Sequence, residues 1–155
     1  MITYLKGNLL DSDCDYICHQ VNCRGVMGAG IAKQIRERWP EVYDSYRDFH
    51  EDCIWQKREM LGKVDFAPIF NTKQTVINMF CQDNIGYDGN RYTSYDAFAT
   101  ALYNIMYRVD EGAVIGFPKC IGCGLGGGNW AVISALIEEV LGQDYDVRIY
   151  ELEGA

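Results

Sequence analysis

Basic residues are scarce in this chain of 155 residues, because 14 Lys and Arg stand against 22 Asp and Glu and leave a net charge of −8. Nucleic acid binding draws much of its affinity from Lys and Arg side chains that neutralise phosphates. The composition therefore predicts that nucleic acid is not a partner. A small anion, bound locally by backbone amides and helix ends, stays compatible with it.

Long apolar segments are missing as well, so the sequence predicts no membrane-spanning helix and no membrane partner. Residues 1–6 have the pattern of a strand and lack the apolar core of a signal peptide. No internal repeat, low-complexity tract or flexible linker interrupts the chain. We therefore expect one cytoplasmic domain over residues 1–155, which is an ordinary domain length.

A disulfide framework is not expected either. The chain has 7 cysteines, an odd number, and several of them, such as Cys18 and Cys81, lie within apolar runs. This pattern favours free thiols in a reducing compartment. Cys120 and Cys123 have the spacing of half a zinc site, but the chain offers no second pair of cysteines at that spacing. We expect neither a metal ion nor another cofactor.

Apolar residues gather in short runs that predict strands. The predicted strands are Ile2–Lys6, Tyr16–Val21, Lys63–Ile69, Thr75–Cys81, Ala113–Phe117 and Asp146–Leu152. Between them, apolar residues recur with the period of amphipathic helices. The clearest buried helix faces are Phe98, Ala101, Leu102, Ile105 and Met106, then Ile133, Leu136, Ile137, Val140 and Leu141.

Two further helices are expected, one beginning near Gly30 and one beginning at Pro40, with His50 on the surface of the second. Thr93 and Asp96 have the spacing of a capping box, which predicts a helix start. Strands alternating with helices predict an α/β fold, a three-layer α/β/α sandwich. Because only a short loop separates the first two strands, the sheet need not be wholly parallel.

Two glycine-rich loops each follow a predicted strand and lead into a predicted helix. They are residues 21–31, VNCRGVMGAGI, and residues 118–130, PKCIGCGLGGGNW, in which Asn129 is expected to cap the helix. Glycine lets a ligand approach the peptide plane closely, so that successive N–H groups can converge on phosphate oxygens. Either loop alone is explained equally well as a tight turn. The pair predicts a diphosphate site that needs no Lys or Arg.

Other nucleotide motifs fit poorly. Neither loop continues into the Gly-Lys-Ser/Thr of a P-loop, and neither has the dinucleotide fingerprint after the first strand. The pair resembles the macrodomain family, through Asn22 with residues 28–32 and through residues 121–127. It is most similar to the branch that includes the terminal ADP-ribose protein glycohydrolase, and His19–Pro40 also resembles the fungal ADP-ribose 1″-phosphate phosphatase. The resemblance implies a mixed six-stranded sheet and a cleft for ADP-ribose.

The resemblance also implies which residues contact the ligand. Asn22 would face the distal ribose, and the two loops would hold the diphosphate from opposite sides. Where the family has an Asp that holds the adenine amino group, this chain has Asn8, which implies weaker adenine binding. The implied ligand-binding residues are Asn8, Leu9, Asn22, Met27, Gly28, Ala29, Gly30, Ile31, Pro118, Ile121, Gly122, Cys123, Gly124, Leu125 and Gly126.

Catalysis is less clearly indicated. The glutamyl-hydrolase relative uses a Lys and an Asp, and the matching positions here are Gln82 and Gly126, which supply neither a nucleophile nor a base. The candidate catalytic residues are Asn22, His19 and Asp83. His19 has the neighbours seen in the phosphatase, although a hydrogen-bonded core histidine is the alternative. Cys123 is a further candidate nucleophile, with lining of the loop as its alternative.

Three functions follow from these residues. The first is binding of ADP-ribose with hydrolysis of ADP-ribose esters on protein, by water that Asn22 and the bound diphosphate orient. The second is an ADP-ribose 1″-phosphate phosphatase, and the third is a non-catalytic reader of ADP-ribosylated protein. Among Tyr87, Tyr92 and Tyr95, one side chain is expected either to cover the ligand or to pack at the start of the following helix.

Overall fold

Six strands form one mixed sheet, in the computed structural model that describes residues 1–154. All six predicted strands are confirmed, with ends that move by at most one residue. The strands are β1 (Ile2–Lys6), β2 (Tyr16–Asn22), β3 (Val64–Pro68), β4 (Thr75–Gln82), β5 (Val114–Pro118) and β6 (Asp146–Glu151). Their order across the sheet is β1-β6-β5-β2-β4-β3.

The sheet is mixed for a different reason than expected. β1 and β2 are not paired, because a short 3-10 helix at Leu9–Asp11 lies between them and β1 pairs in parallel with β6. The antiparallel pair is β3 with β4, whereas β2 is parallel to both β4 and β5. The carboxyl ends of β1, β2, β4, β5 and β6 therefore lie along one edge of the sheet.

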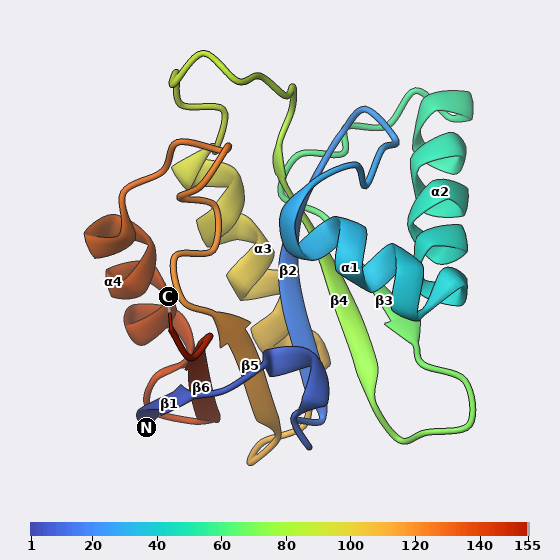
Figure 1. The fold of residues 1–155 in the computed structure, drawn as a ribbon. Coiled ribbons are helices and arrows are strands. Elements are labelled where there is room, and N and C mark those ends of the chain that lie inside the picture. Colours follow the sequence, from blue (N-terminus) through green and yellow to red (C-terminus); the bar gives the residue numbers. More distant parts are fainter. Residues whose placement is uncertain (155) are drawn as a thin grey trace.

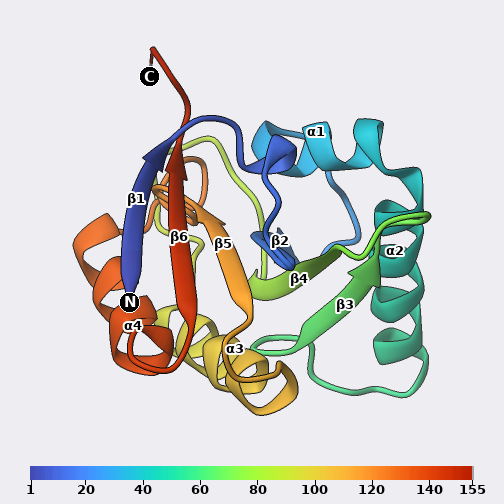
Figure 2. The same ribbon diagram turned by 90° about the horizontal axis from the view of Figure 1, so that it is seen from below.

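Two helices cover each face of the sheet (Figures 1 and 2). One face carries α1 (Gly30–Arg38) and α2 (Pro40–Trp55), and the other carries α3 (Tyr95–Arg108) and α4 (Trp130–Leu141). The expected apolar face of α3 is confirmed, because Phe98, Ala101, Leu102 and Ile105 are fully buried. This arrangement confirms the three-layer α/β/α sandwich.

The core consists of separate apolar clusters on the two faces of the sheet. Alternate residues of β2 divide between them, since Cys18 packs with α3 and α4 whereas Ile17 packs with Ile35 of α1 and Val42 of α2. The strand is buried on both faces, which fits the apolar run of Tyr16, Ile17 and Cys18 at its start. Among residues 1–154, no helix is both long and apolar enough to cross a membrane.

The starts of α3 and α4 are fixed by polar side chains. Asn129 caps α4 as expected, because its Oδ1 accepts a hydrogen bond from the Ala131 amide at 2.8 Å. The expected cap at Thr93 is wrong, since Ser94 Oγ accepts the Ala97 amide at 3.1 Å instead. Thr93 is buried and its hydroxyl donates to the Gly122 carbonyl at 2.7 Å, so it ties two loops together.

His50 was expected on the surface of α2, and this expectation is wrong. The residue is only 7% exposed. Its Nε2 lies 3.0 Å from the carbonyl oxygen of Cys23, and its ring packs near that of Tyr46. His50 therefore connects α2 to the first glycine-rich loop.

His19 belongs to the core as well. Its side chain is fully buried, so it cannot touch a ligand, and the expected catalytic role is wrong. Asn78 donates to Asp65 at 3.1 Å, Ser45 donates to the same carboxylate, and Asn78 Oδ1 accepts from His19 Nε2. His19 thus ends a buried polar chain that crosses β2, β4 and β3 to reach α2.

The burial of His19 predicts acid sensitivity. Burial lowers the pKa of His19 to about 4, while its hydrogen bond to Asn78 acts in the opposite direction. Because the unfolded chain takes up a proton near pH 6.5 and the folded chain does so only near 4, stability falls as the pH drops between these values.

Urea unfolding at pH 6.5 and 4.5 tests this expectation. Between the two values we expect His19→Gln to lose about 2 kcal/mol less than the wild type. The glutamine amide can still hydrogen-bond to Asn78 but does not titrate in this range. Equal losses in the two proteins would show that His19 does not titrate as a buried neutral ring.

Gly116 in β5 predicts a second stability effect. A Cβ at this position would lie 2.6 Å from Leu9 Cδ1 and 2.8 Å from Cys14 Sγ. We expect Gly116→Ala to lower the free energy of unfolding by about 1–3 kcal/mol through overpacking. The control is Gly28→Ala, whose Cβ meets nothing within 4 Å and which should unfold like the wild type. Two equally stable variants would contradict this interpretation.

Candidate functional site

A continuous cleft runs along the carboxyl edge of the sheet. It consists of three connected hollows of about 520, 300 and 130 Å³. The first two share Gly30, Ile31 and residues 118–120. The last two share Ala29, Ala32, Leu125 and two glutamines of the sheet, Gln20 and Gln82. We name them, in this order, the base hollow, the middle hollow and the distal hollow.

The amino end of α1 lines the middle hollow. No side chain caps this helix, and its first internal hydrogen bond runs from the Lys33 amide to the Ala29 carbonyl. The amides of Gly30, Ile31 and Ala32 therefore precede the hydrogen-bonded ladder, and these residues line the hollow. Free amides at a helix amino end, aligned with the helix dipole, attract an anion.

The second glycine-rich loop forms the opposite wall. Cys123 and Gly127 donate their amides back into the loop, to the carbonyls of Cys120 and Gly124. Within residues 1–154, the amides of Gly122, Gly124 and Leu125 have no protein acceptor. Gly122 has a φ of +73°, a left-handed conformation that favours glycine. The wall thus presents amide donors without a cationic side chain.

A hydrogen-bonded floor connects the two walls. Gln20 Nε2 donates to Gln82 Oε1 at 2.9 Å and to the Thr93 hydroxyl at 2.8 Å. The amides of Tyr92 and Thr93 both donate to the carbonyl of Gly126. A Cβ on Gly126 would lie 2.5 Å from the Thr93 hydroxyl. An Asp therefore does not fit at this position.

Asn22 lines the distal hollow, at the point where the pairing of β2 with β4 slips by one residue between Val21 and Asn22. Its Oδ1 accepts from the Arg24 amide at 3.0 Å and lies 2.9 Å from the Tyr46 hydroxyl. Its Nδ2 donates to the Val26 carbonyl at 2.9 Å. One Nδ2 proton remains available for a ligand hydroxyl.

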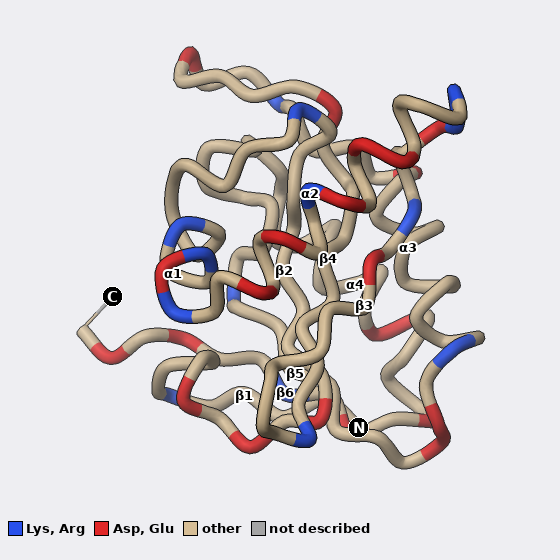
Figure 3. The backbone as a smooth tube through the Cα atoms, turned by 90° about the vertical axis from the view of Figure 1, so that its right-hand side faces the viewer, with Lys and Arg blue, Asp and Glu red and all other residues tan. Residues whose placement is uncertain are grey.

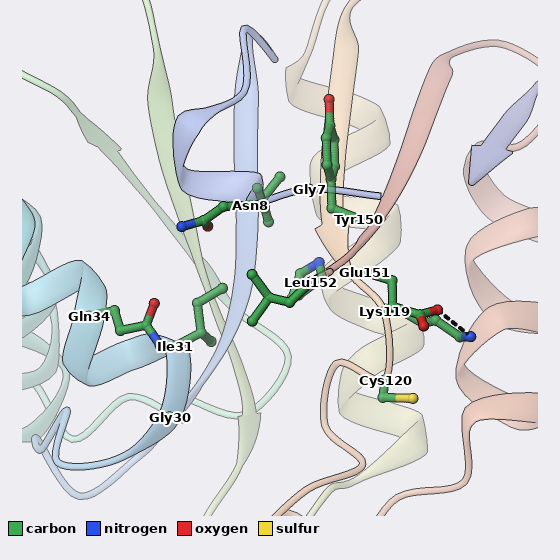
Figure 4. Close-up of a pocket in the computed structure, with 12 residues that line it drawn as sticks. Gly7, Asn8, Gly30, Ile31, Gln34, Lys119, Cys120, Tyr150, Glu151 and Leu152 are labelled. Atoms are coloured by element: carbon green, nitrogen blue, oxygen red, sulfur yellow. Dashed lines mark hydrogen bonds and ion pairs between the residues drawn. The ribbon is translucent and has the colours of Figure 1, made fainter. Parts of the chain in front are cut away.

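The base hollow lies between the 3-10 helix, α1 and β6. Asn8, Ile31, Gln34 and Leu152 face a common space, and Lys119 pairs with Glu151 at its side (Figure 4). Asn8 Oδ1 accepts the Leu10 amide at 3.0 Å. Since the carbonyl end of the amide is engaged in this cap, the Nδ2 donor is the free end of Asn8.

Charged groups along the cleft are balanced. Lys119 Nζ lies 2.6 Å from one carboxylate oxygen of Glu151, and Lys6 lies 2.7 Å from the other. These two hydrogen bonds hold the pKa of Glu151 at about 2. The wider surface is also mixed, with Lys and Arg interspersed among Asp and Glu (Figure 3). In the described chain no three His, Cys, Asp or Glu side chains gather as metal ligands.

The structure brings most of the expected ligand-binding residues together along the cleft. Their contact with a ligand stays a prediction. The residues in the cleft wall are Asn8, Leu9, Asn22, Gly28, Ala29, Gly30, Ile31, Pro118, Ile121, Gly122, Gly124, Leu125 and Gly126.

Three other expected residues lie elsewhere. Met27 is 1% exposed because its side chain packs in the core beside Tyr46, so it cannot line a ligand site. Cys123 points into the loop and core, and burial raises the pKa of its thiol to about 11, which argues against a nucleophile. Asp83 pairs with Arg24 at 3.5 Å and lines a separate hollow.

Several cleft residues were not identified as such from the sequence. Gln20 and Tyr150 lie in strands whose patterns only indicated burial, and no motif marked them. Of the candidate tyrosines, Tyr87 lines the distal hollow, Tyr92 donates to Asp88 at 2.9 Å, and the Tyr95 hydroxyl accepts from the Asn129 amide. The other cleft residues outside the expected ligand-binding set are Gly7, Val21, Val26, Ala32, Gln34, Gln82, Ile85, Gly86, Lys119, Cys120, Glu151 and Leu152.

Comparison with known sequences identifies relatives that align with nearly half or with almost all of this chain. No family model matches the chain. A DNA ADP-ribosyl glycohydrolase of Mycobacterium tuberculosis is 30% identical over 159 aligned residues, which cover 99% of this chain and 43% of the relative. An ADP-ribose 1″-phosphate phosphatase of Saccharomyces cerevisiae is 35% identical over 78 residues, 49% of this chain and 42% of the relative. The chain thus spans less than half the length of these curated relatives.

Solved structures match over almost the whole chain. The macrodomain of Mycobacterium tuberculosis DarG superposes with a TM-score of 0.80 at 25% identity, covering 97% of each chain. A macrodomain protein from Streptomyces coelicolor gives a TM-score of 0.78 at 27% identity, covering 97% of this chain and 98% of the other. The sheet order, the paired glycine-rich loops and these matches agree, and the chain belongs to the macrodomain family.

Proposed function

We propose that this protein binds ADP-ribose in the cleft, as one macrodomain over residues 1–155. The observation that carries the proposal is the pair of amide sets without protein acceptors at residues that line the middle hollow, one at the uncapped start of α1 and one in the loop after β5. Each hydrogen bond from an amide to a charged acceptor is worth about 1.5–3 kcal/mol. Several together suffice for micromolar binding of a diphosphate, about −8 kcal/mol, after the costs of association.

The positions of the adenine and the distal ribose follow from the order of the three hollows along the cleft. Adenine would occupy the base hollow between Ile31 and Leu152, and the distal ribose would lie near Asn22. The anomeric carbon C1″ of this ribose then faces the distal hollow, where a group attached to ADP-ribose would leave the cleft. The partner is accordingly an ADP-ribosylated macromolecule or free ADP-ribose.

Hydrolysis at C1″ is the second part of the proposal, favoured by the 30% identity to a DNA ADP-ribosyl glycohydrolase along 99% of the chain. Water would form a bond to C1″ while the bond to the attached group breaks, and the proton lost by water would pass to the leaving group. Because no Asp, Glu, Lys, Arg or His among the described residues lines the distal hollow, Asn22 and the bound diphosphate would orient this water. A reader without turnover is the alternative that the same geometry allows.

Calorimetric titration with ADP-ribose tests the binding proposal. Gly124 has ordinary backbone angles and open space around its Cβ position, so Gly124→Val fills the middle hollow without straining the fold. We expect the variant to bind ADP-ribose at least about tenfold more weakly, with an unchanged melting temperature. No heat of binding with the wild type at high micromolar ADP-ribose would end the proposal, and product analysis of the same mixtures with ADP-ribosylated substrate separates a hydrolase from a reader.

Asn8 gives a prediction about the base. In Asn8→Asp, one carboxylate oxygen can keep the hydrogen bond to the Leu10 amide while the other accepts the adenine amino group. We expect affinity for ADP-ribose to rise about tenfold, since a charge-assisted hydrogen bond is worth about 1.5–3 kcal/mol. Inosine diphosphate ribose, which has a carbonyl in place of the amino group, is the control and should gain nothing. An equal gain for both nucleotides would contradict this role of Asn8.

A further inference from the structure

The distal hollow differs from the rest of the cleft in having no described carboxylate, ammonium, guanidinium or imidazole side chain in its lining. Lys119 lines the base and middle hollows, and Glu151 lines the base hollow. In the described structure, no Asp, Glu, Lys, Arg or His lines the distal hollow. A charged group at this end of the cleft would therefore find no side chain of opposite charge.

An apolar collar surrounds this hollow. It consists of Val26, Ile85, Tyr87 and Leu125, which come from three different loops and are 41%, 41%, 77% and 50% exposed. Large exposed apolar side chains that converge on one opening indicate a binding surface more often than scattered ones do. The collar is continuous with the cleft, since Leu125 lines the middle hollow as well.

The polar groups on the floor of the hollow are largely engaged within the protein. Gln82 accepts from Gln20 and donates its Nε2 to the Asn84 carbonyl at 2.8 Å. Both ends of the Asn22 amide are hydrogen-bonded, which leaves a single free Nδ2 proton. Among the side chains of the floor, this leaves one donor, which matches one ribose hydroxyl. Other free donors at this hollow are backbone amides, such as those of Ala32 and Leu125, which carry no net charge.

The charges nearest to the collar in sequence are engaged elsewhere. Arg24 pairs with Asp83 at 3.5 Å, and the guanidinium of Arg91 lies 4.4 Å from the ring centre of Tyr95. Asp88 accepts hydrogen bonds from Tyr92 and Asn90. With a net charge of −8 on the whole chain, the electrostatic field adds no attraction for a further anion.

We propose that the distal hollow and its apolar collar select ADP-ribose derivatives whose group at C1″ is uncharged and apolar or aromatic, and that they reject ADP-ribose 1″-phosphate. This specificity rests on the proposed binding of ADP-ribose. It separates two activities that the curated relatives represent, because a phosphatase must accept a dianionic group at this position.

The physical basis is the difference between burying a neutral group and burying an anion. Leu125, Ile85 and Val26 gain from covering apolar surface, and Tyr87 adds a ring that can pack flat against an aromatic group. A phosphate in the same place loses water and receives no counter-charge, which is costly for any ion. Both effects shift the preference in the same direction.

Titration with three ligands tests the specificity: ADP-ribose, ADP-ribose 1″-phosphate and the phenyl glycoside of ADP-ribose at C1″. We expect the wild type to bind the phenyl glycoside at least as tightly as ADP-ribose, and the 1″-phosphate at least about tenfold more weakly. Mass spectrometry of the mixture after titration checks that the ADP-ribose 1″-phosphate remains intact during the measurement.

Ile85→Lys places a cation in the collar, and Phe70→Lys is the matched control. Phe70 is 68% exposed in the turn between β3 and β4, at the opposite end of these strands from the cleft. Phe70→Lys adds the same charge to the chain as Ile85→Lys. We expect Ile85→Lys to shift the ratio of the two dissociation constants toward the 1″-phosphate by about tenfold. Phe70→Lys should leave that ratio at the wild-type value.

The outcomes are distinct. If ADP-ribose itself does not bind, the proposed function fails and the specificity fails with it. If ADP-ribose binds and the 1″-phosphate binds equally well or better, only the specificity is overturned. An equal shift of the ratio in Ile85→Lys and Phe70→Lys would also overturn it, because the preference would then come from the net charge and not from the collar.

Discussion

Backbone N–H groups without acceptors are the constraint on which the cleft depends. The parallel pairing of β2 with β5 brings the carboxyl ends of these two strands to one side of the sheet, and each of them continues through glycines into a helix. α1 begins without a capping side chain, so its first amides keep their hydrogen-bonding capacity for a ligand. An anionic partner can thus be held by an acidic protein, because the attraction is local and comes from dipoles.

Regular structure was accessible to sequence reasoning because it depends on periodicity. The strands and the buried faces of α3 and α4 follow from apolar spacing, and both glycine-rich loops lie in the cleft where strand-to-helix order placed them. The origin of the antiparallel pair was less accessible. The short segment after β1 is compatible with a hairpin of β1 and β2 or with pairing of β1 to a strand far away in sequence. Only the packing of the whole chain decides between these two.

The roles of side chains were predicted less well, because a motif gives the position of a residue along the chain and not the direction in which its side chain points. Met27 lies between cleft residues in sequence, but its side chain turns into the core. His19 and His50 are polar residues whose burial depends on partners far away in sequence, namely Asn78 and the Cys23 carbonyl. Asn8 was expected to bind adenine more weakly than an Asp, and the sequence did not show that its carbonyl oxygen accepts a hydrogen bond from the Leu10 amide.

The hydrogen bonds of residues 92 and 93 have a consequence for motion. Tyr92 and Thr93 bind the Gly126 carbonyl through their amides, and the Thr93 hydroxyl binds the Gly122 carbonyl. The segment that carries Tyr87 is thereby fastened to the loop that carries Leu125. Because these hydrogen bonds join the two segments, a ligand contact that displaces one of them also acts on the other.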